Sequence, residues 1–421
     1  MNIDILLGLQ WGDEGKGKIV DAISPDYDII ARFQGGPNAG HSLEFNNKKH
    51  VLHLIPSGIF HPEKVNLIGN GVVIDPSVFK KEIEELGIPL DELRKRLLIS
   101  TRANLILPTH RILDAAYESC KGLTKIGSTL KGIGPAYTDK TGRNGLRAGD
   151  ILRDDFRNLF DEHQERHLTI LKNYDLKFDL KEFEKGWFEG IEMMKFFRII
   201  NTEYLINDLI HNGKKVLAEG AQGTMLDVDF GSYPFVTSSN TISAGACTGL
   251  GISPKLTGEI FGIFKAYCTR VGTGPFPTEL HNETGRILRE KGHEFGSTTG
   301  RPRRCGWLDI PALKYSIMIN GITQLFMTKA DVMSGFKNVR ICTSYKTDGI
   351  ECKEIPFHID SVIEPIYTEM DGWSENITGI RDYDKLPGTL KKFIAFVESE
   401  TGVPVTMVSV GPDREETIFR K

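Results

Sequence analysis

The sequence predicts an α/β fold: a large, mostly parallel, twisted central β-sheet flanked by helices, with helical insertions. Short apolar runs that end in glycine or polar turns recur along the chain, which is typical of buried strands. Helical patterns lie between several of these runs, and this alternation favours a parallel sheet covered by helices. One long segment is charged, almost free of glycine and helical in its apolar spacing, which predicts the insertion.

The first strand is expected in residues 3–10, followed by a glycine-rich loop and a helix over 18–24. Further strands are expected within residues 28–36, 65–75, 214–223, 259–272, 322–331 and 403–418, and a helix over 76–87. A mainly helical insertion is expected at about 151–212, with these residues at helical spacing as its core: Phe156, Leu159, Phe160, Phe183, Trp187, Ile191 and Met194. Because no internal repeat or Pro/Ser-rich linker interrupts the chain, we expect residues 1–421 to form a single domain.

The composition points to small-molecule partners. The 421 residues contain 52 Lys and Arg against 56 Asp and Glu, so no basic excess favours nucleic acid or anionic membranes. The six cysteines form no C-x-x-C pair, which argues against a zinc site and a disulfide scaffold and favours reduced, mostly buried thiols. The N-terminus lacks a signal-peptide pattern, and no apolar stretch approaches the roughly 18 residues that span a bilayer. We therefore expect a soluble, cytoplasmic protein.

The glycine-rich segment GLQWGDEGKGKIVD has the G-x-x-x-x-G-K spacing of a phosphate-binding loop from Gly12 onward. Its glycines allow close approach to phosphate, Lys16 and Lys18 supply charge, and the next helix adds the positive end of its dipole. Ile19 stands where such loops carry the Ser or Thr that binds Mg²⁺, and Asp13 can supply the missing hard oxygen. An ordinary glycine-rich turn between a strand and a helix is the alternative.

A second segment, LFMTKAD, predicts a strand that ends in T-K-x-D at Asp331. In GTP-binding folds an Asp so placed accepts hydrogen bonds from the guanine N1–H and 2-amino group, while the Lys329 stem covers the ring. Each such bond is worth roughly 1.5–3 kcal/mol, and adenine cannot reciprocate. A strand-end salt bridge is the alternative, but together with the loop the segment predicts a P-loop-related GTP-binding architecture.

Two further loops carry candidate residues. The segment RFQGGPNAGHS holds Asn38 and His41 among glycines, a setting that favours hydrogen bonding to a developing oxyanion or phosphoryl oxygen over a structural role. The segment GSTTGRPRRCGWLD carries three arginines within four residues beside three hydroxyls, which suits bidentate capture of carboxylate or phosphate. A solvated basic loop is the alternative. Binding of carboxylate or phosphate by this loop predicts a small acidic substrate.

Together these segments resemble the adenylosuccinate synthetase family, whose members are GTP-dependent and join IMP to L-aspartate on the route to AMP. The segments QWGDEGKGK and GIGPAYTDK are similar to the two family signatures, and EGAQGTMLD, VTSSNT, GTGPFPTEL, TTGRPRRCGWLD and VSVGP follow in the family's order. The resemblance runs from about residue 3 to the C-terminus. It implies a ligase that makes adenylosuccinate, GDP and phosphate through 6-phosphoryl-IMP, in the first committed step from IMP to AMP, with Mg²⁺ as cofactor.

The resemblance also implies residue roles. Asp13 is the general base on N1 of the purine and, with the Gly40 carbonyl, a Mg²⁺ ligand, and His41 stabilises the γ-phosphoryl group moving to O6 of IMP. GTP binding is implied for Gly12, Asp13, Glu14, Gly15, Lys16, Gly17, Lys18, Gly40, His41, Ser42, Arg303, Lys329, Ala330, Asp331, Ser409, Val410 and Gly411. IMP binding is implied for Asp13, Glu14, Gly15, Lys16, Asn38, Ala39, Gly40, His41, Thr129, Arg143, Gln222, Thr237 and Arg301, with Arg143 reaching in from the second subunit of a homodimer. L-Aspartate binding is implied for Ser297, Thr298, Thr299, Gly300, Arg301, Pro302 and Arg303.

A carboxylate is a weak base for a ring N–H, and the cations expected near Asp13 weaken it further. Proton loss is therefore expected to be coupled to phosphoryl transfer. Four positions depart from the commonest family pattern without removing a catalytic group, so they bear on affinity rather than on reaction type: Pro37, Ser42, Pro302 and Ala330.

Two other functional classes are alternatives. A regulatory GTPase shares the phosphate loop and the T-K-x-D segment, but its loop ends in Lys-Ser or Lys-Thr and it does not explain the arginine-rich loop. An inactive interaction protein does not explain why the candidate catalytic and binding side chains are retained together: Asp13, Lys16, His41, Arg301 and Arg303.

Overall fold

The computed structural model describes residues 2–45, 48–122, 125–296, 300–357, 359 and 363–420. Its centre is a ten-stranded sheet in which all neighbouring strands are parallel except β19 and β20. From edge to edge the strands are β20 (Thr417–Phe419), β19 (Val405–Ser409), β15 (Gln324–Thr328), β11 (Thr257–Lys265), β1 (Ile3–Gly8), β10 (Val216–Glu219), β2 (Ile29–Arg32), β5 (Val65–Ile68), β7 (Leu97–Ser100) and β9 (Arg198–Ile200). The predicted fold class is confirmed.

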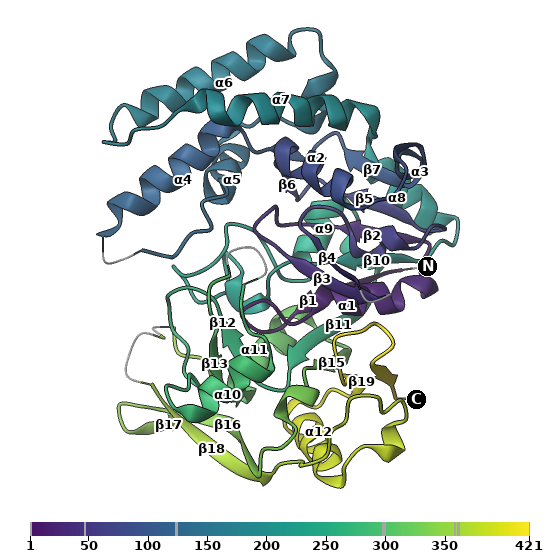
Figure 1. Cartoon of the computed structure of the whole chain (residues 1–421), viewed down its shortest axis with the longest axis vertical. Helices are drawn as coiled ribbons and strands as arrows, with labels where there is room; N and C mark the ends of the chain where they lie inside the picture. Colours follow the sequence, from purple (N-terminus) through teal and green to yellow (C-terminus); the bar gives the residue numbers. More distant parts are fainter. Residues whose placement is uncertain are drawn as a thin grey trace.

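Four smaller sheets accompany the large one. Three are pairs: β3 (His41–Phe45) with β4 (Lys48–Leu52), β6 (Val73–Ile74) with β8 (Asn104–Leu105), and β12 (Cys268–Arg270) with β13 (Arg304–Gly306). The fourth contains β14 (Leu308–Asp309), β16 (Asn338–Thr347), β17 (Ile350–Cys352) and β18 (Ile363–Asp371). In the view of Figure 1, β16 to β18 lie at the bottom of the molecule.

The described residues form twelve α-helices. They are α1 (Lys16–Ile23), α2 (Pro76–Glu85), α3 (Leu90–Arg96), α4 (Pro108–Cys120), α5 (Ile133–Gly142), α6 (Phe156–Leu171), α7 (Leu180–Phe196), α8 (Thr202–His211), α9 (Ala244–Leu250), α10 (Glu283–Lys291), α11 (Ile310–Asn320) and α12 (Gly388–Thr401). Helices α4 to α7 gather at the top of the molecule in Figure 1. The chain ends are both on the right of the same view.

Each strand and helix predicted from the sequence is found, and the residues at two helix starts explain why those helices begin where they do. Helix α2 begins where Pro76 occupies the first helical position and the Asp75 carboxylate accepts the Ser77 N–H at 3.0 Å. Helix α1 begins at Lys16, two residues before the predicted start, because Gly15 adopts a left-handed conformation (φ 91°) that turns the chain out of the loop.

The segment from Ile151 to Asn212 contains α6, α7, β9 and α8. Its aromatic side chains pack together, with the Phe160 and Trp187 ring centroids 4.8 Å apart. The interpretation of the apolar pattern as core is confirmed for five of the seven residues, which are buried in one cluster with β5 and β7 side chains: Phe156, Phe160, Trp187, Ile191 and Met194. Leu159 and Phe183 are half-buried. Strand β9 adds to the edge of the central sheet beside β7.

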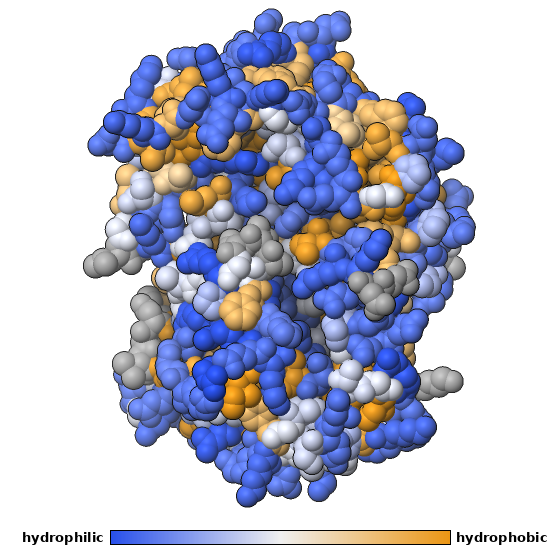
Figure 2. All heavy atoms as spheres, in the orientation of Figure 1, coloured by the Kyte–Doolittle hydropathy of each residue, from blue (hydrophilic) through white to orange (hydrophobic). Residues whose placement is uncertain are grey.

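The surface seen in Figure 2 is mostly hydrophilic, with separate apolar spots. Among the described residues, none of the helices combines the length and apolar character that a membrane span requires. All six cysteines are free thiols, of which Cys268, Cys305 and Cys342 are buried and Cys120 is exposed. The expectation of mostly buried thiols is therefore met by only half of them.

Candidate functional site

Polar residues end four of the five adjacent strands at the centre of the large sheet. Arg32 is the last residue of β2, Glu219 of β10, Lys265 of β11 and Thr328 of β15. Between them β1 ends at Gly8 and continues into the phosphate-loop segment. Because these strands are parallel, their carboxyl ends all lie at the same end of the sheet, which we call its carboxyl edge. Ligands of open α/β sheets bind there.

The phosphate loop is shaped from within by Glu14. This fully buried carboxylate accepts the N–H groups of Gln10 at 3.1 Å and Gly12 at 2.9 Å, and it pairs with Lys16 Nζ at 2.5 Å. Asp13, in contrast, has a positive φ of 60° and a side chain that is 29% exposed. The Glu14 carboxylate therefore hydrogen-bonds to the loop itself, whereas the Asp13 carboxylate is open to a ligand.

Lys18 connects the loop to the C-terminal turn. Its Nζ donates to Ser409 Oγ at 2.7 Å and to the Gly411 carbonyl at 2.6 Å. Burial lowers the pKa of Lys18 to about 8, against the opposing charges of Asp331 and Glu416. The structure thus brings together two predicted GTP-binding segments, the phosphate loop and the turn that contains Val410.

The predicted base-reading segment lies beside the same loop. Thr328 Oγ1 donates to the Glu14 carbonyl at 2.7 Å, which joins the end of β15 to the phosphate loop. Lys329 has a positive φ of 62°, and its Nζ donates to the Gly292 carbonyl at 2.9 Å. Asp331 is half-buried, burial raises its pKa, and Ala330 beside it is fully buried.

His41 is held against the loop by a carboxylate that the sequence analysis did not single out. Gly17 packs on the His41 backbone so closely that a Cβ there would lie 2.8 Å from the His41 Cβ. The Nδ1 of His41 lies 2.5 Å from Glu219 Oε1, and Glu219 also accepts the Ser57 N–H at 2.8 Å and the Ser57 hydroxyl at 2.7 Å. The pKa of Glu219 is lowered: burial opposes ionisation, but the hydrogen bond from His41 and the nearby cations outweigh it.

The remaining nitrogen of His41 is buried and, within the described part of the chain, has no hydrogen-bond partner. Since the Glu219 carboxylate only accepts, the proton of the neutral ring sits on Nδ1 and a lone pair on Nε2. Burial lowers the pKa of His41 to about 4, which keeps the ring neutral. A polyanion next to Nε2 would raise that pKa and turn Nε2 into a charged donor.

Two predicted IMP-binding residues also have unsatisfied buried atoms. Within the described ranges, Asn38 Oδ1 and both side-chain amide atoms of Gln222 have no hydrogen-bond partner. Gln222 has a positive φ of 57°, an uncommon conformation for a residue other than glycine. Buried amides without partners are rare in folded proteins, so these groups are suited to a polar ligand.

The other predicted IMP-binding and metal-binding residues are distributed more widely. Thr237 and Gly40 are half-buried and Ala39 is buried, with its carbonyl 2.5 Å from His53 Nδ1. Thr129 and Arg143 are exposed, and in the chain they precede and follow α5. Ser42 is half-buried on β3.

The arginine-rich loop is described only in part, since Ser297, Thr298 and Thr299 lie outside the described residues. Gly300 donates to the Gly296 carbonyl at 2.8 Å, and exposed Pro302 forms a bridge with Phe295. The carbonyl of Arg301, whose residue is exposed, accepts the Gly296 N–H at 2.8 Å.

Arg303 turns inward and meets the phosphate loop. Its Nε lies 2.8 Å from Asp13 Oδ2, and its Nη1 lies 2.5 Å from Glu294 Oε2. Glu294 is buried and pairs with fully buried Lys265, with Nζ and Oε1 3.0 Å apart. Lys265 and Glu294 escaped the sequence analysis because they are far apart in sequence, and only the position of Lys265 at a strand end could have indicated it.

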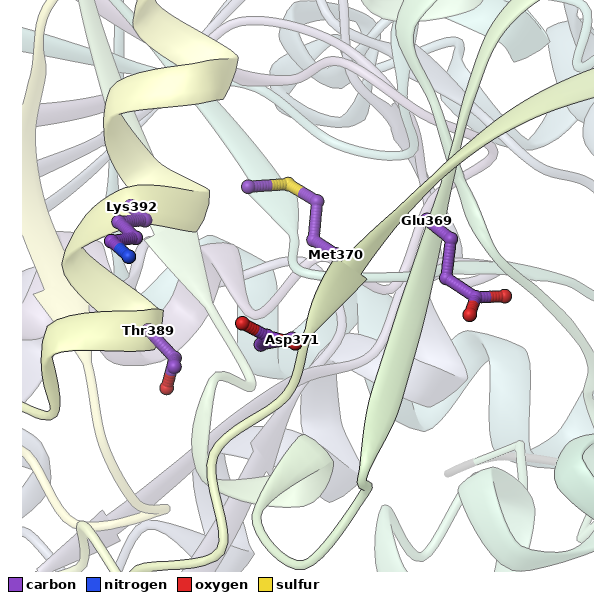
Figure 3. Close-up of a pocket in the computed structure, with 5 residues that line it drawn as sticks. All are labelled: Glu369, Met370, Asp371, Thr389 and Lys392. Carbon is purple, nitrogen blue, oxygen red and sulfur yellow. The ribbon is translucent and has the colours of Figure 1, made fainter.

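A pocket elsewhere has none of these groups. It lies between β18 and α12, has a volume of about 270 Å³, and is lined by Glu369, Met370, Asp371, Thr389 and Lys392 (Figure 3). None of the residues predicted to bind a ligand lines it. We therefore place the candidate site at the carboxyl edge of the sheet.

Known proteins match the whole chain. The family model for adenylosuccinate synthetase matches residues 5–418. The adenylosuccinate synthetase of Bacteroides fragilis is 58% identical over 420 residues, covering 100% of this chain and 99% of the relative, and that of Porphyromonas gingivalis is 57% identical with the same coverage. The fully ligated adenylosuccinate synthetase of Plasmodium falciparum superposes with a TM-score of 0.95 at 40% identity over 100% of both chains.

A more distant structure shares the fold alone. The succinoaminodeoxyadenylate synthetase of cyanophage S-2L has a TM-score of 0.65 at 19% identity, covering 99% of this chain and 95% of that one. The full-length matches above decide the assignment, because they join high identity to complete coverage. The chain therefore belongs to the adenylosuccinate synthetase family.

Proposed function

We propose that this chain is a cytoplasmic, homodimeric ligase that joins IMP and L-aspartate to give adenylosuccinate, with GTP converted to GDP and phosphate. The residues 1–421 act as one domain with a mainly helical insertion at about 151–212. The observation that carries the proposal is a set of buried polar atoms with no hydrogen-bond partner in the described part of the chain: His41 Nε2, Asn38 Oδ1 and the Gln222 amide. These groups offer donors and acceptors beside a loop suited to phosphate.

The first chemical step transfers the γ-phosphoryl group of GTP to O6 of IMP. The bond from the β,γ-bridging oxygen to the γ-phosphorus breaks, a bond from O6 to phosphorus forms, and Asp13 takes the N1 proton. Negative charge builds on the moving phosphoryl group, and His41, charged by its approach, donates from Nε2. Glu219 and Ser57 support the step by fixing the ring so that Nδ1 donates to Glu219.

The second step replaces phosphate by the amine of L-aspartate. The amine attacks C6 of 6-phosphoryl-IMP, the bond from C6 to oxygen breaks, phosphate leaves, and the nitrogen loses a proton to give adenylosuccinate. We assign the substrate carboxylates to the loop from Ser297 to Arg303, where Arg301 and Arg303 are suited to bidentate contacts. Asp331 reads guanine, and Arg143 reaches IMP from the second subunit.

The donor set fits a hard cation. Asp13 offers a partly exposed carboxylate and Gly40 a backbone carbonyl, and both are oxygen ligands of the kind Mg²⁺ prefers. When bound, Mg²⁺ would neutralise phosphate charge at the loop. Arg303 Nε, 2.8 Å from Asp13 Oδ2, is then available to a substrate anion in place of Asp13.

Omission assays test this function. Protein, GTP, Mg²⁺, IMP and L-aspartate are mixed, and phosphate release and the purine absorbance change are followed while each component is left out in turn. We expect both signals to require the complete mixture. GTP hydrolysis that is indifferent to IMP and aspartate would instead support a regulatory GTPase, and no reaction in the complete mixture would support an inactive interaction protein.

A further inference from the structure

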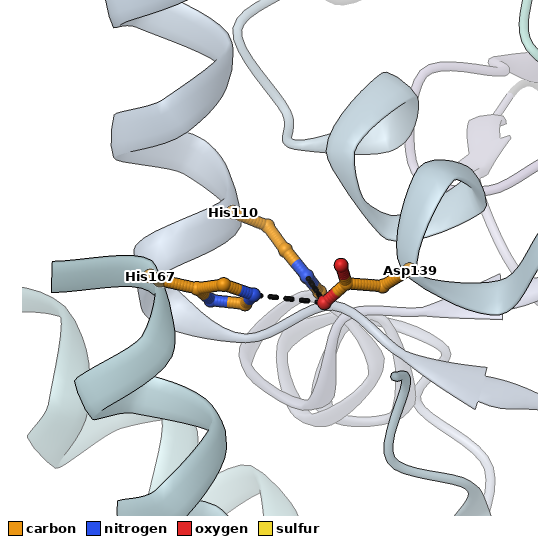
Figure 4. Close-up of side chains that lie close together, drawn as sticks. All are labelled: His110, Asp139 and His167. Atoms are coloured by element: carbon orange, nitrogen blue, oxygen red, sulfur yellow. Dashed lines mark hydrogen bonds and ion pairs between the residues drawn. The ribbon is translucent and has the colours of Figure 1, made fainter. Parts of the chain in front are cut away.

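Three side chains from three helices lie close together, and none of them is among the predicted site residues (Figure 4). They are His110 of α4, Asp139 of α5 and His167 of α6. Asp139 Oδ2 lies 3.0 Å from His110 Nε2 and 2.8 Å from His167 Nε2. Both histidine side chains are only 1% exposed. We call these three residues the histidine clamp.

Two histidines and a carboxylate could hold a metal ion, and their ligand atoms lie within 4.8 Å of one another. The surroundings of His110 oppose this use. Its Nδ1 accepts the Leu107 N–H at 3.0 Å, so the proton of the neutral ring must be on Nε2. A metal on Nε2 would need that proton on Nδ1, facing the Leu107 N–H. The clamp is therefore built to donate two hydrogen bonds to Asp139.

The charges of the clamp agree with this assignment. Burial lowers the pKa of His110 to about 4, against the hydrogen bond that its Nε2 donates to Asp139, so the ring is neutral. Asp139 is ionised, because the hydrogen bonds from both histidines outweigh burial and hold its pKa well below the usual value. A carboxylate that accepts two buried N–H groups is a strong and directional anchor.

Asp139 anchors the end of α5 through its backbone as well. Its carbonyl accepts the N–H of Asn144 at 2.8 Å, and Arg143 caps the helix with a positive φ of 62°. At the other end of α5, Gly132 lies so close to His110 that a Cβ there would be 2.9 Å from the His110 backbone carbon. His110 therefore fixes α5 at its start and, through Asp139, at its final turn.

We propose that the histidine clamp is a positioning device that holds α5 so that Arg143 is presented at the angle needed to contact IMP in the second subunit. This rests on the proposed function of Arg143. Arg143 is exposed and has a long side chain, so its reach depends on where the last turn of α5 is held. Small displacements of a substrate-positioning group reduce catalysis strongly. Through His167 the clamp also gives the helical segment that contains α6 a part in substrate binding.

The first test replaces His167 by Phe, which removes the donor to Asp139 and retains a ring of similar size. We expect the KM for IMP to rise by about tenfold, with the KM values for GTP and L-aspartate within about twofold of the wild type. His167→Gln, whose amide N–H can still reach Asp139, should recover most of the loss. An unchanged KM for IMP, or an equal rise in all three KM values, would contradict positioning.

If His167→Phe does not fold, Asp139→Asn replaces it. The amide oxygen still accepts but carries no charge, so both hydrogen bonds weaken without being removed. The same selective rise in the KM for IMP is expected, at a smaller size. A rise absent from this variant would count against the clamp in the same way.

The second test combines the clamp with Arg143. In an Arg143→Leu background, His167→Phe should change the KM for IMP by less than about twofold, because the group that the clamp positions is gone. A second, independent tenfold rise would overturn the proposal. Arg143→Leu alone separates the two claims. An unchanged KM for IMP in Arg143→Leu contradicts the role of Arg143 itself. A raised KM in Arg143→Leu, together with no effect of His167→Phe in the otherwise wild-type chain, contradicts only the clamp.

Discussion

Two regions of this molecule place a buried histidine on a carboxylate, and they differ in whether the second ring nitrogen has a hydrogen-bond partner. His41 donates to Glu219 and leaves Nε2 without a partner within the described residues. His110 donates to Asp139 from Nε2 and accepts the Leu107 N–H at Nδ1, so both of its nitrogens are engaged. The open nitrogen of His41 marks a side chain that can act on a substrate. The His110 ring, with both nitrogens hydrogen-bonded, marks a side chain that stabilises the fold.

The largest effect is expected at the open carboxylate of the phosphate loop. Asp13→Ala should abolish turnover, because no other described carboxylate of the loop is open: Glu14 is buried and paired with Lys16. GTP should still bind, which isothermal titration measures. Asp26→Ala, at an exposed position of a short turn, is the control and should keep the wild-type rate. Appreciable residual turnover in Asp13→Ala would exclude Asp13 as the base.

The next largest effect is expected for Glu219→Gln. The amide can donate to Nδ1 and stabilise the wrong tautomer of His41, so kcat should fall by about 10²–10⁴-fold with little change in KM. Ser57→Ala removes only one hydrogen bond to the same carboxylate and should cost less than about fivefold. Steady-state kinetics of both variants decide this. A Glu219→Gln enzyme with nearly normal kcat would show that His41 does not depend on Glu219.

Asp331→Asn addresses base reading with a smaller expected effect. It should weaken GTP binding by roughly 10–100-fold, because a charged acceptor for two hydrogen bonds is lost, and should shift the preference toward a xanthine nucleotide. Titration with GTP and XTP measures both. Asp348→Asn, exposed in a turn, is the matched control. Unchanged GTP affinity in Asp331→Asn would show that another group reads the base.

Much of this site could be predicted from local sequence. The glycine spacing, the T-K-x-D strand end and the arginine-rich loop each lie within one short segment, so their chemistry is visible without the fold. Glu219, Glu294 and Lys265 could not be identified in that way, because their roles depend on the order of strands in the sheet. The spacing also could not show that the charge of Lys16 is matched by Glu14, or that Lys18 supports the C-terminal turn.

The two regions should behave alike in one respect, their response to acid. Burial lowers the pKa of both His41 and His110 to about 4, whereas an unfolded histidine titrates near 6.5. Between about pH 6.5 and 4 the unfolded chain binds protons that these folded rings do not, so stability falls as the pH falls through this window. The loss is about 1–3 kcal/mol per histidine.

Urea unfolding at pH 7.5 and pH 5 measures this loss. His41→Asn and His110→Asn should each lose less stability between the two pH values than the wild type, since each lacks one of the titrating rings. A variant whose stability falls as much as that of the wild type would show that its histidine is not held neutral in the folded state.

The distinction between the two rings is tested most directly by ¹⁵N NMR of histidine-labelled protein, with His41→Asn and His110→Asn used to assign the signals. We predict that His41 carries its proton on Nδ1 and His110 on Nε2. Addition of GTP, Mg²⁺ and IMP should protonate Nε2 of His41 and leave His110 unchanged. A His41 ring protonated at Nε2 before any substrate is added, or a His110 ring that follows the substrates in its place, would contradict the account.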